Sequence, residues 1–413
     1  MKNFKVILMA VITCTVFTSY AQNLPSLLLD KNINATFSIV AYDEKTKEWG
    51  IAVATDNIYV GNSTIYIQPG IGAFSVIAET EPNYGVKGLA MLEAGRSIEQ
   101  SIIEIKNQDN NSNYRQVSGI DAKGEVFAFT GQSLKYWQGH AGKVLGENHV
   151  VIGNQLSPQV LTQMSQTFID ATGTLAQRLL ASLLAGQQVG GQISGKQSAA
   201  IVVKGLNNEW YNQIDLRVDH SKTPFLDLQR LMNYHYGRIQ LSQSLYAHRQ
   251  GNAKIAKHKL SKAEIMLDGW TGIYSRIAVA HVLIHDDETA AIPWINKGLK
   301  ENENWHVNLP AFFFLKNQAE LKSLINPETF TVKDWESAIQ MLSQLGREVD
   351  VINIAHELKK NHIESSHLSF LIGRSHFYEK EIKQATSYLK SALELDPKNI
   401  EARKLITQIN ARN

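Results

Sequence analysis

The pattern of apolar and polar residues near the N-terminus predicts a β-hairpin. Apolar and small side chains alternate in residues 36–42 and again in 49–54, and the charged segment 43–48 lies between them. Two short β-patterned runs joined by a polar loop are typical of a hairpin. The first run begins at Thr36, so we expect this threonine at one end of a strand.

Farther along the chain, strand patterns alternate with pairs of helical patterns. Strands are predicted at residues 63–68, 71–78, 115–120, 125–130, 149–152, 198–203 and 214–218. Helices are predicted at residues 86–94, 98–106, 158–171, 175–185 and 224–236. Hairpins separated by paired helices favour a layered α+β sandwich over a doubly wound parallel sheet.

From about residue 238 the strand patterns end and helical periodicity continues. Gly373 is followed by Ala385, Leu389, Ala392 and Pro397 at the spacing of a tetratricopeptide unit, in which small residues let two helices pack closely. Weaker copies of the second-helix pattern occur at residues 256–263, 291–298 and 351–358. We predict an all-α solenoid of about four degenerate units. A helical bundle with accidental spacing is the alternative.

The N-terminal segment has the features of a secretory signal peptide. Lys2 and Lys5 precede an apolar run at 6–17 that is too short to span a membrane, and a small-residue cleavage site ends at Ala21. The protein is therefore expected to be exported, to the periplasm or the cell exterior. The predicted organisation is a signal peptide at 1–21, a connector or propeptide at 22–35, an α+β domain at 36–237 and a helical repeat domain at 238–413.

Composition excludes several function classes. The chain has 41 basic and 39 acidic residues, and loss of Lys2 and Lys5 with the signal peptide leaves 39 of each. A neutral chain has no electrostatic footprint for nucleic acid or an anionic membrane. The single cysteine, Cys14, lies in the signal peptide, which excludes disulfides, a thiol nucleophile and thiolate metal ligands. No H-E-x-x-H spacing occurs, and we expect neither a metal nor another cofactor.

One segment imitates a phosphate-binding loop. Residues 190–196 fit G-x-x-x-x-G-K, but Gln197 stands where a serine or threonine would bind Mg²⁺. The segment also follows a predicted helix and precedes a predicted strand, whereas a phosphate loop leads from a strand into a helix. A nucleotide site is therefore excluded here.

Thr36 is a candidate nucleophile if the chain is cut before it. A free α-amine, with a reference pKa of roughly 7.7 to 8.0, can accept the proton of the hydroxyl on the same residue. N-terminal-threonine hydrolases use this arrangement. A threonine that opens a strand is otherwise simply a good β-former.

Three charged residues share one face of a predicted strand. Alternation places Asp215, Arg217 and Asp219 on the same side of residues 214–218 and their flank. Such a row either lies on a solvated sheet edge or holds a substrate carboxylate and orients an N-terminal amine.

Nine short segments resemble, in order, those of domain-of-unknown-function family 1028, which is regarded as similar to N-terminal-nucleophile hydrolases. They are residues 36–41, 50–54, 84–85, 115–117, 128–131, 137–140, 153–156, 197–200 and 215–219. The resemblance covers about half of the chain and implies a four-layer αββα sandwich. It also implies that Thr36 takes the nucleophile's place and that Asp56 supplies an acid on the second strand. Because Thr36 lies 14 residues (22–35) beyond the predicted signal cleavage site, a further cut is required.

This resemblance assigns expected roles to further residues. Asp56, Asp215, Arg217 and Asp219 are expected to orient the amine and the substrate, and backbone N–H groups near Ala78 and Glu79 to receive the oxyanion. The residues expected to bind substrate are Glu79, Tyr84, His140, Asn154 and Ser198.

Two functional interpretations remain open at this point. The first is an exported hydrolase that uses Thr36 to cleave a small amide or peptide. The second is a non-catalytic protein whose tetratricopeptide-like repeats hold a protein partner in their groove. Self-association into a homo-oligomer is compatible with both. The state of the Thr36 amine discriminates them, because an amine in a peptide bond cannot act as a base.

Overall fold

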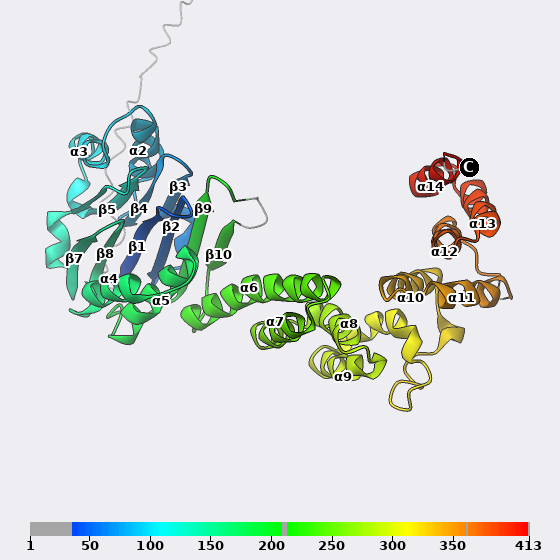
Figure 1. Ribbon diagram of the computed structural model, residues 1–413. Helices are drawn as coiled ribbons and strands as arrows, with labels where there is room; N and C mark the ends of the chain where they lie inside the picture. The colour runs from blue at the N-terminus through cyan, green and yellow to red at the C-terminus, as the bar shows by residue number, and fades with distance from the viewer. Residues whose placement is uncertain (1–34, 209–212, 361, 412–413) are drawn as a thin grey trace, which may run out of the picture. The chain divides into compact units, whose positions relative to one another are not determined.

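The computed structural model describes residues 35–208, 213–360 and 362–411 (Figure 1). The chain divides into two compact units. Unit 1 ends at Met232 and unit 2 begins at Asn233, so the boundary between them falls inside helix α6 (Pro224–Arg249). Unit 1 has antiparallel sheets with helices, and unit 2 is helical, so the predicted α+β class followed by a helical C-terminal region is confirmed. The predicted signal peptide, and the connector except for Ala35, lie outside the described residues.

Two antiparallel sheets form the middle of unit 1. The larger has the strand order β10-β9-β2-β1-β8-β7, and the smaller has the order β3-β4-β5-β6. The strands are β1 (Thr36–Asp43), β2 (Glu48–Thr55), β3 (Ile65–Gln68), β4 (Gly72–Ala78), β5 (Arg115–Asp121), β6 (Val126–Thr130), β7 (His140–Gly146), β8 (His149–Leu156), β9 (Ser198–Gly205) and β10 (Ile214–Val218).

Helices cover the outer face of each sheet. Helices α2 (Asn83–Glu93) and α3 (Ile98–Gln108) pack on the smaller sheet, and α4 (Val160–Asp170) and α5 (Leu175–Gln188) pack on the larger one. Capping boxes fix the first turns of α3 and α5. The remaining elements of unit 1 are the short helix α1 (Val60–Ser63) and the 3₁₀ turns η1 (Ser112–Tyr114) and η2 (Gln132–Tyr136).

Strand β1 is central to the larger sheet and is buried on both faces. Val40 packs between the sheets against Ile77 and Ile120. Phe37, on the opposite face, stacks on Phe225 of α6 at a ring-centroid distance of 6.1 Å. Burial on both faces explains why β1 is apolar almost throughout. The exceptions are Asp43, the last residue of the strand, and Thr36 and Ser38, which share the face of Val40.

Unit 2 consists of helices that pack on their sequence neighbours. They are α7 (Ala253–Met266), α8 (Tyr274–His285), α9 (Ile292–Glu301), α10 (Val332–Gln344), α11 (Glu348–Lys360), α12 (Ser366–Tyr378), α13 (Ile382–Leu395) and α14 (Ile400–Asn410), with 3₁₀ segments η3 (Thr271–Ile273), η4 (Glu288–Ala291), η5 (Glu303–Leu315) and η6 (Pro327–Thr329). Gly373 of α12 faces Leu389 of α13 so closely that a Cβ would lie 3.0 Å from Leu389 Cγ. The tetratricopeptide-like assignment itself stays a prediction.

Two elements differ from the sequence-based expectation. No strand was predicted between residues 130 and 149, but His140 begins the edge strand β7. The side chains of β7 are all exposed or half-buried, so this stretch of sequence lacks the apolar alternation that would predict a strand. The strand is defined by its pairing with β8. Helix α6 continues to Arg249, beyond the predicted end at residue 236. Among the described residues, no helix is long and apolar enough to cross a bilayer.

Truncation of Leu179 on α5 tests the contact between this helix and the larger sheet. Leu179 is fully buried, and its Cδ1 lies 2.5 Å from the position that a Cβ on Gly50 would occupy. We expect Leu179→Ala to lower the free energy of unfolding of unit 1 by about 2–5 kcal/mol, because it leaves a cavity under β2. Leu226→Ala is the matched control, since Leu226 is 64% exposed and its loss should change stability by less than about 0.5 kcal/mol. Equal effects of the two variants on urea unfolding would contradict this packing.

Candidate active site

Thr36 begins β1 and lies among buried polar side chains. It pairs with Thr55 of β2 on one side and with Asn154 of β8 on the other. Its exposed fraction is only 6%. Alternation directs the Thr36 side chain to the face that meets the smaller sheet, as it does for Ser38, which accepts a hydrogen bond from Ser75 of β4. The hydroxyl is therefore shielded from bulk water.

The hydroxyl groups of Thr36 and Thr55 form a directed chain. Thr55 Oγ1 donates to the carbonyl oxygen of Ala35 at 2.8 Å. A hydroxyl has one proton to donate, so Thr36 is the donor in the 3.0 Å contact between the two threonine oxygens. The Thr36 proton therefore points at Thr55, and the Thr55 proton points at the peptide group that precedes Thr36.

Two more donors reach the carbonyl oxygen of Ala35. Gln192 Nε2 lies 2.5 Å from it, and the backbone N–H of Asp56 donates to it at an N···O distance of 3.3 Å. Gln192 is 5% exposed and comes from the segment between α5 and β9. Three converging donors polarise a carbonyl and stabilise the negative charge that develops on its oxygen during nucleophilic attack.

Asp56 follows β2 directly and is short of one hydrogen-bond donor. Burial raises the pKa of its carboxyl above the ordinary value, against the opposing effect of a hydrogen bond from Ser194 Oγ to Oδ2. Oδ1 is buried and has no hydrogen-bond partner among the described residues. A buried acceptor without a donor costs roughly 1–3 kcal/mol, so Oδ1 leaves an uncompensated polar atom in this site.

A cavity of ≈340 Å³ opens beside Thr36. Its wall combines the hydroxyl side chains of Thr36, Thr55 and Thr64 with the apolar Ile77 and two charged residues, Glu79 and Arg115. A space of this volume suits a small ligand or the end of a peptide.

Arg115 is held at the cavity wall by an acid behind it. Its Nε donates to Asp109 Oδ2 at 3.0 Å, and its Nη1 donates to the backbone oxygen of Glu79 at 2.9 Å. The Tyr84 hydroxyl donates to the same Asp109 carboxylate at 3.3 Å. Burial, together with this carboxylate, raises the pKa of Tyr84 above its ordinary value. The Arg115 and Asp109 side chains are 10% and 12% exposed, so they form a shielded ion pair.

Asn154 and Ser198, two of the expected substrate-binding residues, lie next to Thr36 or its cavity but do not line the cavity. Asn154, paired with Thr36, donates from Nδ2 to Gln116 Oε1 at 3.1 Å. Ser198 donates to the backbone oxygen of Asn57 at 2.7 Å and accepts from the Val60 N–H at 3.2 Å. Asn57 and Val60 line the cavity, so Ser198 holds the segment that forms its rim.

The charged row expected to orient the amine lies apart from Thr36. Asp215, Arg217 and Asp219 are on or next to the edge strand β10, which β9 and β2 separate from β1 by about 14 Å in all. Arg217 binds both carboxylate oxygens of Asp215, from Nε at 2.6 Å and from Nη2 at 3.0 Å. These residues satisfy one another at an exposed sheet edge, so the structure does not bring them to the candidate nucleophile.

Three further expectations need correction. Tyr84 is fully buried on α2 and binds Asp109, so it packs behind the cavity and does not line it. His140 is exposed at the start of the edge strand β7, away from the cavity lining. Glu79 lines the cavity, but its backbone N–H donates to the Tyr114 oxygen at an N···O distance of 3.2 Å and is not available to an oxyanion.

Sequence reasoning missed Thr55 and Gln192. The register of the predicted hairpin pairs residue 36 with residue 55, so the hairpin carried a signal for Thr55. Gln192 lies in the segment that imitates a phosphate loop, 157 residues from Ala35 along the chain, and no local pattern relates the two. The same segment supplies Ser194, the partner of Asp56.

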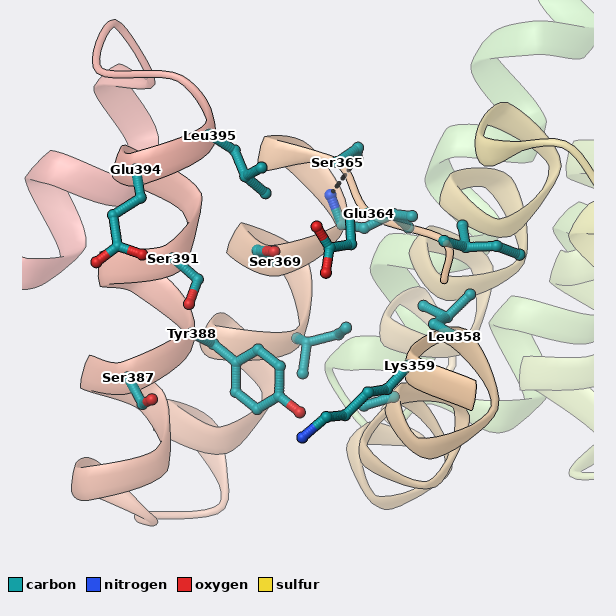
Figure 2. A pocket seen from close by; sticks show the side chains of 14 residues that line it. Leu358, Lys359, Glu364, Ser365, Ser369, Ser387, Tyr388, Ser391, Glu394 and Leu395 are labelled. Carbon is teal, nitrogen blue, oxygen red and sulfur yellow. Dashed lines mark hydrogen bonds between the residues drawn. The ribbon is translucent and has the colours of Figure 1, made fainter. Parts of the chain in front are cut away.

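Unit 2 contains a separate cavity of ≈510 Å³ among α11, α12 and α13 (Figure 2). Figure 2 shows Lys359 and Tyr388 reaching toward one another across it, with Glu364 and Ser369 nearby. Apolar side chains such as Leu358 complete the wall. The mixture of apolar and polar groups suits an extended peptide.

In the part of the chain that the structure describes, no three or more His, Cys, Asp or Glu side chains are arranged to hold a metal ion. The acid beside Thr36, Asp56, instead binds a serine hydroxyl.

Comparison with known proteins places the site within a family. Residues 36–228 match a family described as "Family of unknown function (DUF1028)". A protein from Silicibacter pomeroyi, whose crystal structure is described under the same family, is 30% identical; the match covers 48% of this chain and 84% of that chain, with a TM-score of 0.44. No curated protein matches the chain. On the family match and this sequence identity, the chain belongs, through residues 36–228, to DUF1028, a family of unknown function.

Proposed function

We propose that unit 1 is an amide hydrolase of the N-terminal-nucleophile type, in which Thr36 becomes the nucleophile after the bond between Ala35 and Thr36 is cut. The observation that carries this proposal is the set of three donors on the Ala35 carbonyl oxygen, from Thr55, Gln192 and Asp56. The packing of helices on the outer faces of two facing sheets agrees with the αββα sandwich of such hydrolases.

The geometry supports cleavage by the chain itself. Thr36 Oγ attacks the carbonyl carbon of Ala35 while its proton passes to Thr55 Oγ, and the Thr55 proton passes to the carbonyl oxygen. The C–N bond then breaks as the new hydroxyl proton moves to the Thr36 nitrogen, which leaves an ester between Ala35 and Thr36. Water hydrolyses this ester to an Ala35 carboxylate and a Thr36 with a free amine.

Cleavage frees the groups that an amide hydrolase needs. The α-amine of Thr36 can accept the hydroxyl proton, and Asp56 Oδ1 offers that amine an acceptor without another partner among the described residues. The three donors lose the Ala35 oxygen and become available to the oxygen of a substrate carbonyl. Thr36 also lines the cavity, so a substrate placed there lies next to its hydroxyl.

The proposal includes export. The predicted signal peptide at 1–21 supports it, and the protein is expected to work in the periplasm or outside the cell. Cleavage after Ala35 would then remove the remaining segment 22–35 as a propeptide.

Replacement of Thr36 tests the proposed function. The recovered wild-type chain is expected to begin at Thr36, whereas Thr36→Ala should keep the preceding segment, because alanine has no hydroxyl to attack Ala35. Thr36→Ser should cleave. Thr46→Ala is the control, since Thr46 is exposed in the hairpin loop and its loss should leave cleavage unchanged. N-terminal sequencing with intact mass measures the result, and cleavage at the same bond in Thr36→Ala would rule out the mechanism.

The proposed proton relay predicts a specific effect at Thr55. Thr55→Val keeps the side-chain shape but removes the hydroxyl, and we expect it to slow cleavage by about 10²–10³-fold, the usual effect of losing one oxyanion donor. Thr55→Ser restores the hydroxyl and should cleave at nearly the wild-type rate. The measurement follows the intact mass of newly purified chain over time. If Thr55→Val cleaves at the wild-type rate, the Thr55 hydroxyl does not pass the proton and the proposed relay is wrong.

The cavity in unit 2 supports a second candidate function, the binding of a partner protein by tetratricopeptide-like repeats. Its wall offers Lys359, Glu364 and Tyr388 to a peptide (Figure 2). We expect the full chain to capture one defined exported protein. Tyr388→Ala should weaken that capture at least about tenfold, because Tyr388 is a half-buried aromatic side chain that a bound peptide would cover, and truncation of such an anchor typically has this effect. Tyr378→Ala is the control, an exposed tyrosine outside the cavity. Equal capture by both variants would exclude this cavity as the binding site.

A further inference from the structure

The charges around the Thr36 cavity do not cancel. Glu79 and Arg115 are its charged lining residues, and Asp109 lies directly behind Arg115. The carboxylates of Glu79 and Asp109 together carry two negative charges, and the Arg115 guanidinium carries one positive charge. The net charge of the three groups is therefore −1. The ion pair of 3.0 Å between Arg115 and Asp109 uses the positive charge, so the surplus resides on Glu79.

The Glu79 carboxylate has unused hydrogen-bonding capacity. Its closest ion-pair contact, from Oε2 to Arg115 Nη1, is 3.7 Å, too long for a hydrogen bond. Neither of its oxygens has a hydrogen-bond partner among the described residues, although its side chain is only 17% exposed. The carboxylate is half-shielded at the cavity wall and can accept from water or from a ligand, and a positively charged donor matches both its charge and its lone pairs.

Among the described residues, Arg115 is the cationic side chain of the lining. Besides Arg115 and Glu79, the described lining consists of hydroxyl, amide and apolar side chains, among them Thr64, Asn57 and Ile77. The guanidinium is held by Asp109 through Nε and by the Glu79 backbone oxygen through Nη1, so its two closest acceptors are groups other than the Glu79 carboxylate.

We propose that this cavity selects amides that carry a free ammonium group, which Glu79 binds beside the bond that Thr36 attacks. The substrate class is an amino acid amide or a peptide with an unblocked N-terminus. This inference rests on the proposed function for the reaction at Thr36, but the recognition step is independent of catalysis and can be measured in its absence.

The experiment measures binding to a Thr36→Ala chain produced so that it begins at residue 36, the form that cleavage after Ala35 leaves; without the hydroxyl it cannot turn over its ligand. Two probes of nearly equal shape are compared by calorimetry at pH 7: L-alaninamide, which carries an ammonium, and L-lactamide, in which a hydroxyl replaces it. We expect L-alaninamide to bind about tenfold more tightly or better, as a charge-assisted hydrogen bond implies. The preference should vanish well above pH 8, where an α-amine loses its charge (reference pKa about 8).

Variants at Glu79 localise the effect. Glu79→Gln in the Thr36→Ala chain should bring the two affinities to within about threefold of each other, whereas Glu79→Asp keeps the charge and should retain the preference. Glu81→Gln is the matched control, because Glu81 lies two positions away and does not line the cavity. Equal binding of the two probes, tighter binding of L-lactamide, or binding of neither overturns the proposal. An intact preference in Glu79→Gln overturns the assignment to Glu79. Failure of the chain to cleave after Ala35 would instead count against the proposed function alone.

Discussion

Three hydrogen bonds to one carbonyl oxygen, that of Ala35, connect the separate parts of the candidate site. Thr55 ends β2, Asp56 follows it, and Gln192 comes from the segment that returns from α5 to β9. Two of the donors are consecutive residues at the end of β2 and the third comes from a segment far along the chain, so all three meet only when β1 has paired with β2 and that segment has packed beside them. The site is therefore a product of the whole sandwich, and its polarisation of one peptide bond depends on the complete fold.

Three buried acceptors on residues around Thr36 lack donors among the described residues. Asp56 Oδ1, Asn154 Oδ1 and Gln192 Oε1 are buried without hydrogen-bond partners among the described residues. Each such atom costs roughly 1–3 kcal/mol in a folded protein. Natural sequences tolerate this cost at sites where function requires it. A free amine at Thr36 would supply donors at this place, which links the cost to the cleavage that we propose.

The strands that position the site were predicted more successfully from the sequence than the individual residues that complete it. Alternation in residues 36–54 identified the hairpin, but Thr55, which the structure pairs with Thr36, was not recognised as part of the site. Local patterns could not relate Gln192 to Ala35, because that contact depends on tertiary packing across 157 residues. The charged row of β10 was a true local pattern, but alternation cannot distinguish an exposed sheet edge from an active site. Edge strand β7 escaped detection because an exposed strand needs no apolar alternation.

The most direct test of this account is the N-terminal sequence, with intact mass, of the wild-type protein recovered from its exported compartment. Self-cleavage predicts a chain that begins at Thr36, with a free α-amine next to the hydroxyl. A chain that begins near Gln22, with Thr36 still in a peptide bond, would contradict it, because a blocked amine cannot serve as the base.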